Sequence, residues 1–141
     1  MKAECARLVR LRRLEKVRAL AKQNAAREAA AAEGTLAQLQ ALSDRTGAMA
    51  SHYAARREVQ DGASLRQLGS FVHGLNTLSQ TTQGDAARAR AIADAKLRLL
   101  AEAERRRAAT EERAALQERM IGKSAQAPVL GSRKPSGTGL E

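Results

Sequence analysis

The sequence predicts an all-α protein, a long two-helix antiparallel coiled-coil hairpin followed by a disordered C-terminal tail. Residues 2 to 121 consist mainly of Ala, Leu, Arg, Glu, Gln and Lys, which have the highest helix propensities. Only Tyr53 and Phe71 are aromatic among 141 residues, so a globular core would lack its usual large side chains. A short cluster of helix-breaking residues, 61–64, separates two long stretches of this composition. The composition is therefore typical of long helices that pair with each other.

The first helix is predicted from about residue 3 to residue 60, with a seam that is less regular than that of the second helix. Spacings of three and four residues give one interpretation of this seam, which is Leu11, Leu14, Arg18, Ala21, Ala25, Glu28, Ala32, Thr35, Leu39, Leu42, Thr46, Met49 and Tyr53.

Residues 61–64 predict the turn of the hairpin. Gly62 suits the left-handed residue that ends a helix. Ser64 and Gln67 have the spacing of a capping box at the start of the next helix. Because the break between two long helices is so short, we expect the helices to be antiparallel.

The second helix is predicted from about residue 64 to residue 121, with a heptad seam that continues without a slip. Eleven of its seventeen positions are apolar and three more are Ser or Thr, which is the pattern of a coiled coil. The positions are Leu65, Leu68, Val72, Leu75, Ser79, Thr82, Ala86, Ala89, Ala93, Lys96, Leu100, Ala103, Arg107, Thr110, Ala114, Gln117 and Ile121. Residues 1–121 thus form the predicted hairpin, and residues 122–141, rich in Gly, Ser, Pro and basic residues, a disordered basic tail.

The formal net charge of +10 is concentrated near the two ends of the chain. Residues 1 to 27 hold nine Lys or Arg and two Glu, and residues 105–107 are three consecutive arginines. A hairpin brings these segments together at its open end. Such a basic end would meet nucleic acid, anionic lipid or an acidic protein surface, or it is simply a solvated helix face.

No residues with the pattern of a catalytic, cofactor or metal site are found, and we expect a protein that is not an enzyme. His52 and His73 are the only histidines, and no zinc-ligand spacing or phosphate-binding loop occurs. The single Cys5 favours a reducing compartment. No secretory signal or membrane span is recognised, so we expect a cytosolic protein or one held at a membrane by a partner.

One cluster of large apolar residues lies near the predicted turn. Phe71, Leu75, Leu78 and Thr82 form a stripe at helical spacing, and the hairpin places Leu42, Met49 and Tyr53 opposite them. One interpretation is a local core that fixes the turn. The other is an exposed patch that binds a partner protein, because a two-helix hairpin cannot bury residues on every side.

Residues 59–75, VQDGASLRQLGSFVHGL, resemble the flagellar export protein FliJ family, which is related to the YscO-like stalks of type III secretion. The family pattern is a glycine at the turn, a small residue, a leucine, then a phenylalanine and a leucine four residues later. The less specific resemblance extends over residues 5 to 121, and the segment from Tyr53 to Gly62 is shorter than is usual in the family.

The resemblance implies a stalk that binds the flagellar export ATPase FliI and the export gate protein FlhA. It would promote assembly of the ATPase ring and couple it to proton-driven export, with export chaperones as further partners. Phe71 and Leu75 match gate-contacting positions, and Tyr53 matches an aromatic position of the first helix. Leu78, Thr82 and Met49 join them as candidate gate contacts.

The candidate ATPase contacts are the basic residues Arg7, Arg10, Arg12, Arg13 and Arg106. The resemblance further implies a monomer when free, no nucleic acid as partner, and a cytoplasmic location at the flagellar base, peripheral to the inner membrane. Two alternatives stay open, a basic coiled coil that binds nucleic acid and a structural scaffold or coiled-coil dimer.

Overall fold

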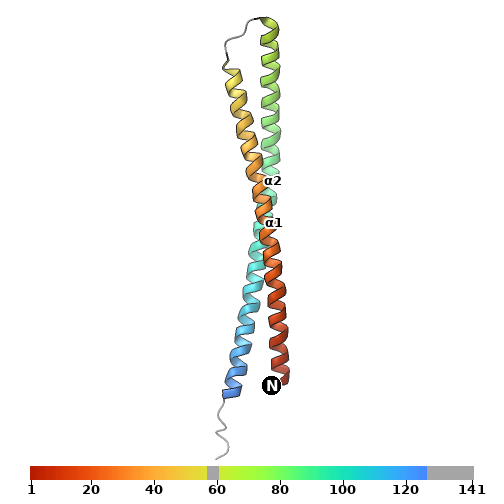
Figure 1. The fold of residues 1–141 in the computed structure, drawn as a ribbon, viewed down its shortest axis with the longest axis vertical. Coiled ribbons are helices and arrows are strands. Elements are labelled where there is room, and N and C mark those ends of the chain that lie inside the picture. The colour runs from red at the N-terminus through yellow and green to blue at the C-terminus, as the bar shows by residue number, and fades with distance from the viewer. Residues whose placement is uncertain (57–60, 127–141) are drawn as a thin grey trace, which may run out of the picture. The chain divides into compact units, whose positions relative to one another are not determined.

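The computed structural model describes residues 1–56 and 61–126, which form two long helices (Figure 1). Helix α1 spans Lys2–Ala54 and helix α2 spans Gly62–Gln126. The described residues contain no strand, so the predicted all-α class is confirmed. Contacts divide the chain into a terminal unit, residues 1–20 with 105–141, and a central unit, residues 21–104. Within each unit the segments of α1 and α2 pack against each other in antiparallel directions.

The predicted seam of α2 is confirmed. Sixteen of its seventeen positions are buried or half-buried, and only Leu65, at the start of the helix, is 58% exposed. We number the heptads of α2 so that Leu65 stands at position a and Leu68 at position d. Every later a and d residue as far as Ile121 is then shielded from solvent, which is the pattern of a continuous coiled-coil seam.

The predicted seam of α1 is half wrong. Seven of the thirteen predicted positions are shielded as expected, namely every seventh residue from Leu11 to Tyr53. The six positions between them are wrong, because in each case the next residue along the chain is the shielded one. The displaced predictions are Leu14, Ala21, Glu28, Thr35, Leu42 and Met49, all of which are exposed. The shielded residues are instead Glu15, Lys22, Ala29, Leu36, Ser43 and Ala50. The true seam is as regular as that of α2, but these six positions hold mainly polar or small residues.

Small side chains occupy the fully buried positions of the seam in the central unit and let the two helices approach closely there. Ala29, Ala50 and Ala93 are at most 3% exposed. The other buried residues here are also small, namely Ser43, Thr46, Ser79, Thr82, Ala86 and Ala89. A Cβ atom added at Gly47 would lie 3.5 Å from the Ser79 hydroxyl oxygen, which shows how near α2 comes to the α1 backbone.

The buried hydroxyl groups of the seam bond mainly to their own helix. Thr46 donates to the Leu42 carbonyl at 2.7 Å, and Thr82 donates to the Leu78 carbonyl at 2.7 Å. Ser79 instead donates across the seam to the Ser43 carbonyl at 3.4 Å. Among the described residues every buried side-chain N or O atom has a partner, so the polar seam has no unsatisfied group that would weaken it.

Helix α2 begins with a cap that differs from the predicted one. The Ser64 backbone N–H donates to a carboxylate oxygen of Asp61 at 2.7 Å, and the Asp61 carbonyl accepts from the Leu65 N–H at 3.1 Å. Asp61 is therefore the N-cap residue, and the predicted capping box of Ser64 with Gln67 is wrong by three residues. Gly62 is the first residue of α2, and no described glycine has a positive φ, so its predicted left-handed conformation is also wrong.

The ends of both helices differ from the predicted bounds. Helix α1 ends at Ala54, one residue after the last seam residue Tyr53, and not near residue 60. The heptad would next require the polar residues Arg57 and Gln60. Helix α2 continues past Ile121 to Gln126, so the predicted start of the tail at residue 122 is wrong. The prediction of disorder for residues 127–141 lies outside the described residues.

We predict a pH-dependent contribution of the Asp61 cap to stability. The backbone hydrogen bond from Ser64 lowers the pKa of Asp61 below its ordinary value of 3.8, so folding favours the ionised form. The contribution is fully present above this value and is lost as the pH falls through the lower pKa of the folded state. Thermal unfolding followed by circular dichroism should show Asp61→Ala less stable than wild type at pH 7, with the difference shrinking in acid. Asp61→Asn, which retains an acceptor but does not titrate in this range, should lack the acid-dependent loss.

We also predict that the small, fully buried positions of the seam in the central unit do not accept large side chains. Ala93 is 2% exposed, and Ala93→Leu should lower the free energy of unfolding by about 1–3 kcal/mol, as overpacking does in closely packed sites. Ala91→Leu, two residues away on the exposed side of the same helix, is the matched control and should change stability little. Equal stability of the two variants in urea unfolding would show that the helices do not approach as closely as described.

Candidate protein-binding surface

The central unit has two flanks of opposite character, because several of its large apolar side chains lie on one side of the seam. In an antiparallel pair the g positions of both helices border one flank and the e positions border the other. With Leu8 at position a of α1, the g positions hold six of the large exposed apolar residues. We call this set the apolar flank, and it consists of Leu42, Met49, Phe71, Leu78, Ile92 and Leu99, each 40–56% exposed.

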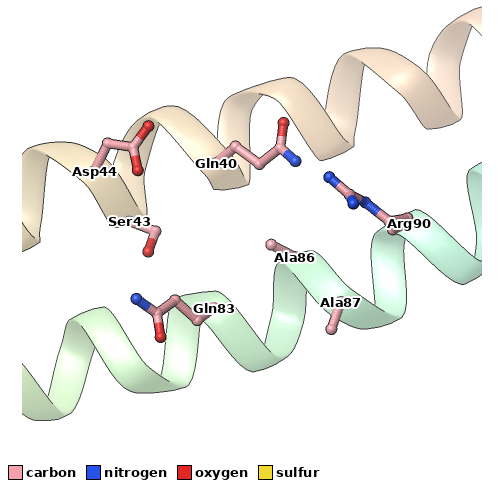
Figure 2. A pocket seen from close by; sticks show the side chains of 7 residues that line it. All are labelled: Gln40, Ser43, Asp44, Gln83, Ala86, Ala87 and Arg90. Atoms are coloured by element: carbon pink, nitrogen blue, oxygen red, sulfur yellow. The ribbon is translucent and has the colours of Figure 1, made fainter.

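The flank on the e positions is mainly polar and contains a shallow pocket (Figure 2). Gln40 and Asp44 of α1 and Gln83 and Arg90 of α2 line it, with Ser43 and Ala86 of the seam at its base. The side chains of Gln40 and Arg90 point toward one another across it (Figure 2). We call this side the polar flank. The rim of this pocket is polar, whereas the side chains exposed on the opposite flank are apolar.

The two aromatic residues meet near the connection between the helices. The ring centroids of Tyr53 and Phe71 lie 5.1 Å apart in an edge-to-face arrangement, and the guanidinium carbon of Arg56 lies 5.3 Å from the Tyr53 ring centroid. Phe71 is nevertheless 47% exposed. The contact therefore fixes the Phe71 ring against α1 and leaves much of its surface to solvent. The contact supports the interpretation as a local core, and binding of a partner by the exposed part of the ring stays a prediction.

The structure brings five of the six predicted gate contacts together at this end of the central unit. Phe71, Leu78 and Met49 are exposed on the apolar flank. Leu75 and Tyr53 are half-buried beside them. Thr82 does not belong to this surface, because it is 3% exposed and its hydroxyl is bonded to its own helix.

A groove along α2 was not predicted from the sequence. It has a volume of about 540 Å³, and Gln67, Ser70 and Gly74 line it together with Phe71, Leu75 and Leu78. Gly74 creates the groove because it presents no side chain between Phe71 and Leu78. A sequence signal for it exists, because Gly74 stands three residues after Phe71 and four before Leu78, on the same face of the helix. The side chains of Phe71, Leu75 and Leu78 make the lining of the groove largely apolar.

The terminal unit carries most of the positive charge of the chain. The terminal unit has fifteen Lys or Arg residues and six Asp or Glu residues. The central unit has ten Lys or Arg residues and nine Asp or Glu residues. Of the predicted ATPase contacts, Arg7, Arg10 and Arg13 are exposed and form no ion pair with any described residue. Arg7 also lines a groove with Leu11 of α1 and with Arg113, Leu116, Gln117 and Met120 of α2.

Arg12 differs from its neighbours because it joins the two helices of the terminal unit. Its guanidinium lies 3.0 Å from Glu15 of α1 and 2.6 Å from Glu118 of α2. The hydrogen bond to Glu15, followed by that to Glu118, raises the pKa of Arg12 above its ordinary value. Arg12 is thus a structural residue first, and a partner would have to compete with two carboxylates for it.

Arg18 makes a second link between the helices of the terminal unit. It occupies the seam and donates to the Arg106 carbonyl at 3.0 Å and to the hydroxyl of Thr110, which is 1% exposed. Arg106, the remaining predicted ATPase contact, is exposed and accepts this bond through its backbone. Arg12 and Arg106 therefore lie on the basic surface but are already engaged within the fold.

The described residues include no cluster of His, Cys, Asp or Glu with the geometry of a metal site. Within residues 1–56 and 61–126, neither helix has a stretch long and apolar enough to cross a bilayer.

Searches for similar proteins found no matching family model and no significant similarity to a curated protein or a solved structure. The resemblance to the FliJ family therefore remains a prediction that rests on the residues around Phe71.

Proposed function

We propose that this chain is a stalk-like coiled coil of a flagellar type III protein export system. In this role it binds the export ATPase FliI through its terminal unit and the export gate protein FlhA through its central unit. It acts without chemistry of its own, by promoting assembly of the ATPase ring and coupling the ring to proton-driven export. Export chaperones are further partners in the proposal. The observation that carries it is the exposed Phe71 surface beside a groove, in a sequence context similar to that of the family.

The apolar flank near Phe71 supports the part of the proposal that concerns the gate. Phe71 and Leu78 are each about half exposed, and the Phe71 ring is held in place by Tyr53. A fixed aromatic side chain loses little conformational entropy when it binds, which is why such residues often dominate the free energy of an interface. The neighbouring groove of Gln67, Ser70 and Gly74 offers a complementary recess to a partner side chain.

The charge of the terminal unit supports the part that concerns the ATPase. Arg10 and Arg13 are exposed without ion pairs among the described residues, so a partner with acidic loops meets no competing carboxylate there. Charge complementarity of this kind accelerates association and fixes orientation more than it adds affinity. The proposal places the protein in the cytoplasm, at the flagellar base and peripheral to the inner membrane.

Nucleic-acid binding is the second candidate function, favoured by the fifteen basic residues of the terminal unit. Both aromatic residues lie in the central unit, so the basic surface offers no aromatic ring on which a base could stack. DNA binding in the nanomolar range with a steep dependence on salt would favour this alternative.

For the gate contact, we predict that Phe71→Ala lowers affinity for the purified cytoplasmic domain of the gate protein at least tenfold. This loss corresponds to about 1.4 kcal/mol and is in the range of an interface hot spot. Isothermal titration calorimetry measures it, and circular dichroism should show the same helix content as wild type. Leu97→Ala removes a side chain that is 41% exposed on the polar flank of the same unit, and serves as the matched control. Wild-type affinity of Phe71→Ala, or wild-type motility of cells that carry it, argues against the gate contact.

For the ATPase contact, we predict that the double variant Arg10→Glu with Arg13→Glu weakens binding to the export ATPase, because each reversal replaces attraction with repulsion. The matched control is Arg66→Glu with Arg98→Glu, two exposed arginines of the central unit. A pull-down with purified ATPase at physiological salt should retain the control and lose the double variant. Equal retention of both would remove the terminal unit from the interface.

A further inference from the structure

Helix α2 packs against α1 through the apolar stripes at positions a and d, and it has a third apolar stripe that this packing does not bury. A two-stranded coiled coil needs apolar residues at two of every seven positions, a and d, whereas a helix in a larger bundle has three. In the central unit α2 has this third stripe at position g. Its residues are Phe71, Leu78, Asp85, Ile92 and Leu99, of which the four apolar ones are 47–56% exposed. The stripe has the composition of a surface that packs against a further helix.

Small residues border this stripe on its outer side. Position c, one helical turn from g, holds Gly74, Thr81, Arg88 and Ala95, all of which are exposed. The exposed face of α2 therefore consists of a row of large side chains beside a row of small ones, and both rows have a charged residue at their centre. Asp85 and Arg88 form an ion pair with each other there.

The order of residues along this face suits an antiparallel copy of itself. When residue 85 of one copy lies opposite residue 88 of the other, Leu78 faces Ala95, Ile92 faces Thr81 and Leu99 faces Gly74. Each large residue then meets a small one, as helices in close contact require. Each Asp85 faces an Arg88, and because the arrangement is two-fold, every contact occurs twice. Phe71 lies at the end of this register opposite Glu102, so we assign it no part in the contact.

The distribution of charge also favours contact through the central unit. This unit holds ten basic and nine acidic residues, so two copies meet there with little net repulsion. The terminal units, with fifteen basic and six acidic residues each, repel one another. We propose that the face of α2 formed by Leu78, Asp85, Arg88, Ile92 and Leu99 binds a second copy of this chain in antiparallel orientation, forming a reversible dimer.

This dimer does not depend on the proposed export function, and it differs from the monomer that the family resemblance implies. It buries Leu78, which the proposed gate contact also uses. The two interactions therefore compete for this residue, while Phe71 serves the gate contact alone. Ile92→Asp and Phe71→Ala consequently separate the two proposals, since the first acts on the dimer and the second on the gate.

Sedimentation equilibrium of the full chain in reducing buffer tests the dimer. Wild type should show a monomer–dimer equilibrium in the micromolar to submillimolar range, and Ile92→Asp should raise the dissociation constant at least tenfold. Leu97→Asp, on the polar flank of the same helix, is the matched control and should leave the dissociation constant unchanged. Circular dichroism of each variant checks that the helices are retained. A monomer at every concentration overturns the proposal, as does equal weakening by Leu97→Asp.

Charge exchange tests the register of the two copies. Asp85→Arg brings two guanidinium groups together across the contact, and Arg88→Asp brings two carboxylates together, so each single variant should weaken the dimer. The double variant restores an opposite pair across the contact and should recover most of the wild-type dissociation constant. If the single variants dimerise as wild type does, or if the double variant remains as weak as the singles, the register is wrong.

Disulfide cross-linking tests the orientation. In a Cys5→Ser background, Leu78→Cys with Ala95→Cys should give a covalent dimer on mild oxidation, because residues 78 and 95 face each other between antiparallel copies. The two positions lie seventeen residues apart on one helix, about 25 Å, and cannot be joined within a chain. Neither single cysteine variant should cross-link. Efficient cross-linking of Leu78→Cys alone means a parallel contact and overturns the proposal.

Discussion

The close approach of α1 and α2 is the constraint on which the rest of the central unit depends. Alanine, serine and threonine occupy the seam, and Ala93 and Ala50 are each 2% exposed. Small residues take the fully buried positions, while Leu42, Met49, Phe71, Leu78, Ile92 and Leu99 lie beside the seam, on the apolar flank. Alanine buries little area, so the pair relies on its length and on many small contacts. The same arrangement that keeps the buried core small therefore leaves an apolar surface exposed.

The fold class and the seam of α2 could be predicted from the sequence, because leucine and alanine mark that seam at regular spacing. The seam of α1 could not be predicted fully. Leu14, Leu42 and Met49 are the more hydrophobic residues, but Glu15, Ser43 and Ala50 beside them are the ones that face α2. When small or polar residues make the contact between helices, a pattern of hydrophobicity points to the adjacent large residue in the sequence and not to the residue in the seam. Phe71, Leu78 and Met49 were recognised as surface candidates, whereas Thr82 shares their stripe and is buried. The cap at Asp61 was missed because Ser64 offers a similar pattern one turn later.

The two units hold their helices together by different chemistry. In the central unit the buried polar groups are mostly hydroxyls that bond to their own helix, as Thr46 and Thr82 do. In the terminal unit arginines reach across, Arg12 to Glu118 and Arg18 to Thr110. These links use two basic side chains and leave Arg10 and Arg13 exposed for other contacts. The bonds of Arg12 and Arg18 within the fold thus leave Arg10 and Arg13 as exposed residues of this basic surface.

Hydroxyls that bond to their own helix leave the alignment of the central helices weakly specified. Within residues 21–54 and 62–104, Ser79 bonds across the seam to Ser43, and Lys96 to Glu28. If one segment slipped by a heptad, small residues would again meet small residues along much of the seam, and few directional bonds would oppose the slip. Arg18 resists the same slip in the terminal unit, since its guanidinium is received by Thr110 and the Arg106 carbonyl. Because α1 and α2 are each continuous through both units, a slip of the central segments would also require the hydrogen bonds of Arg18 to break.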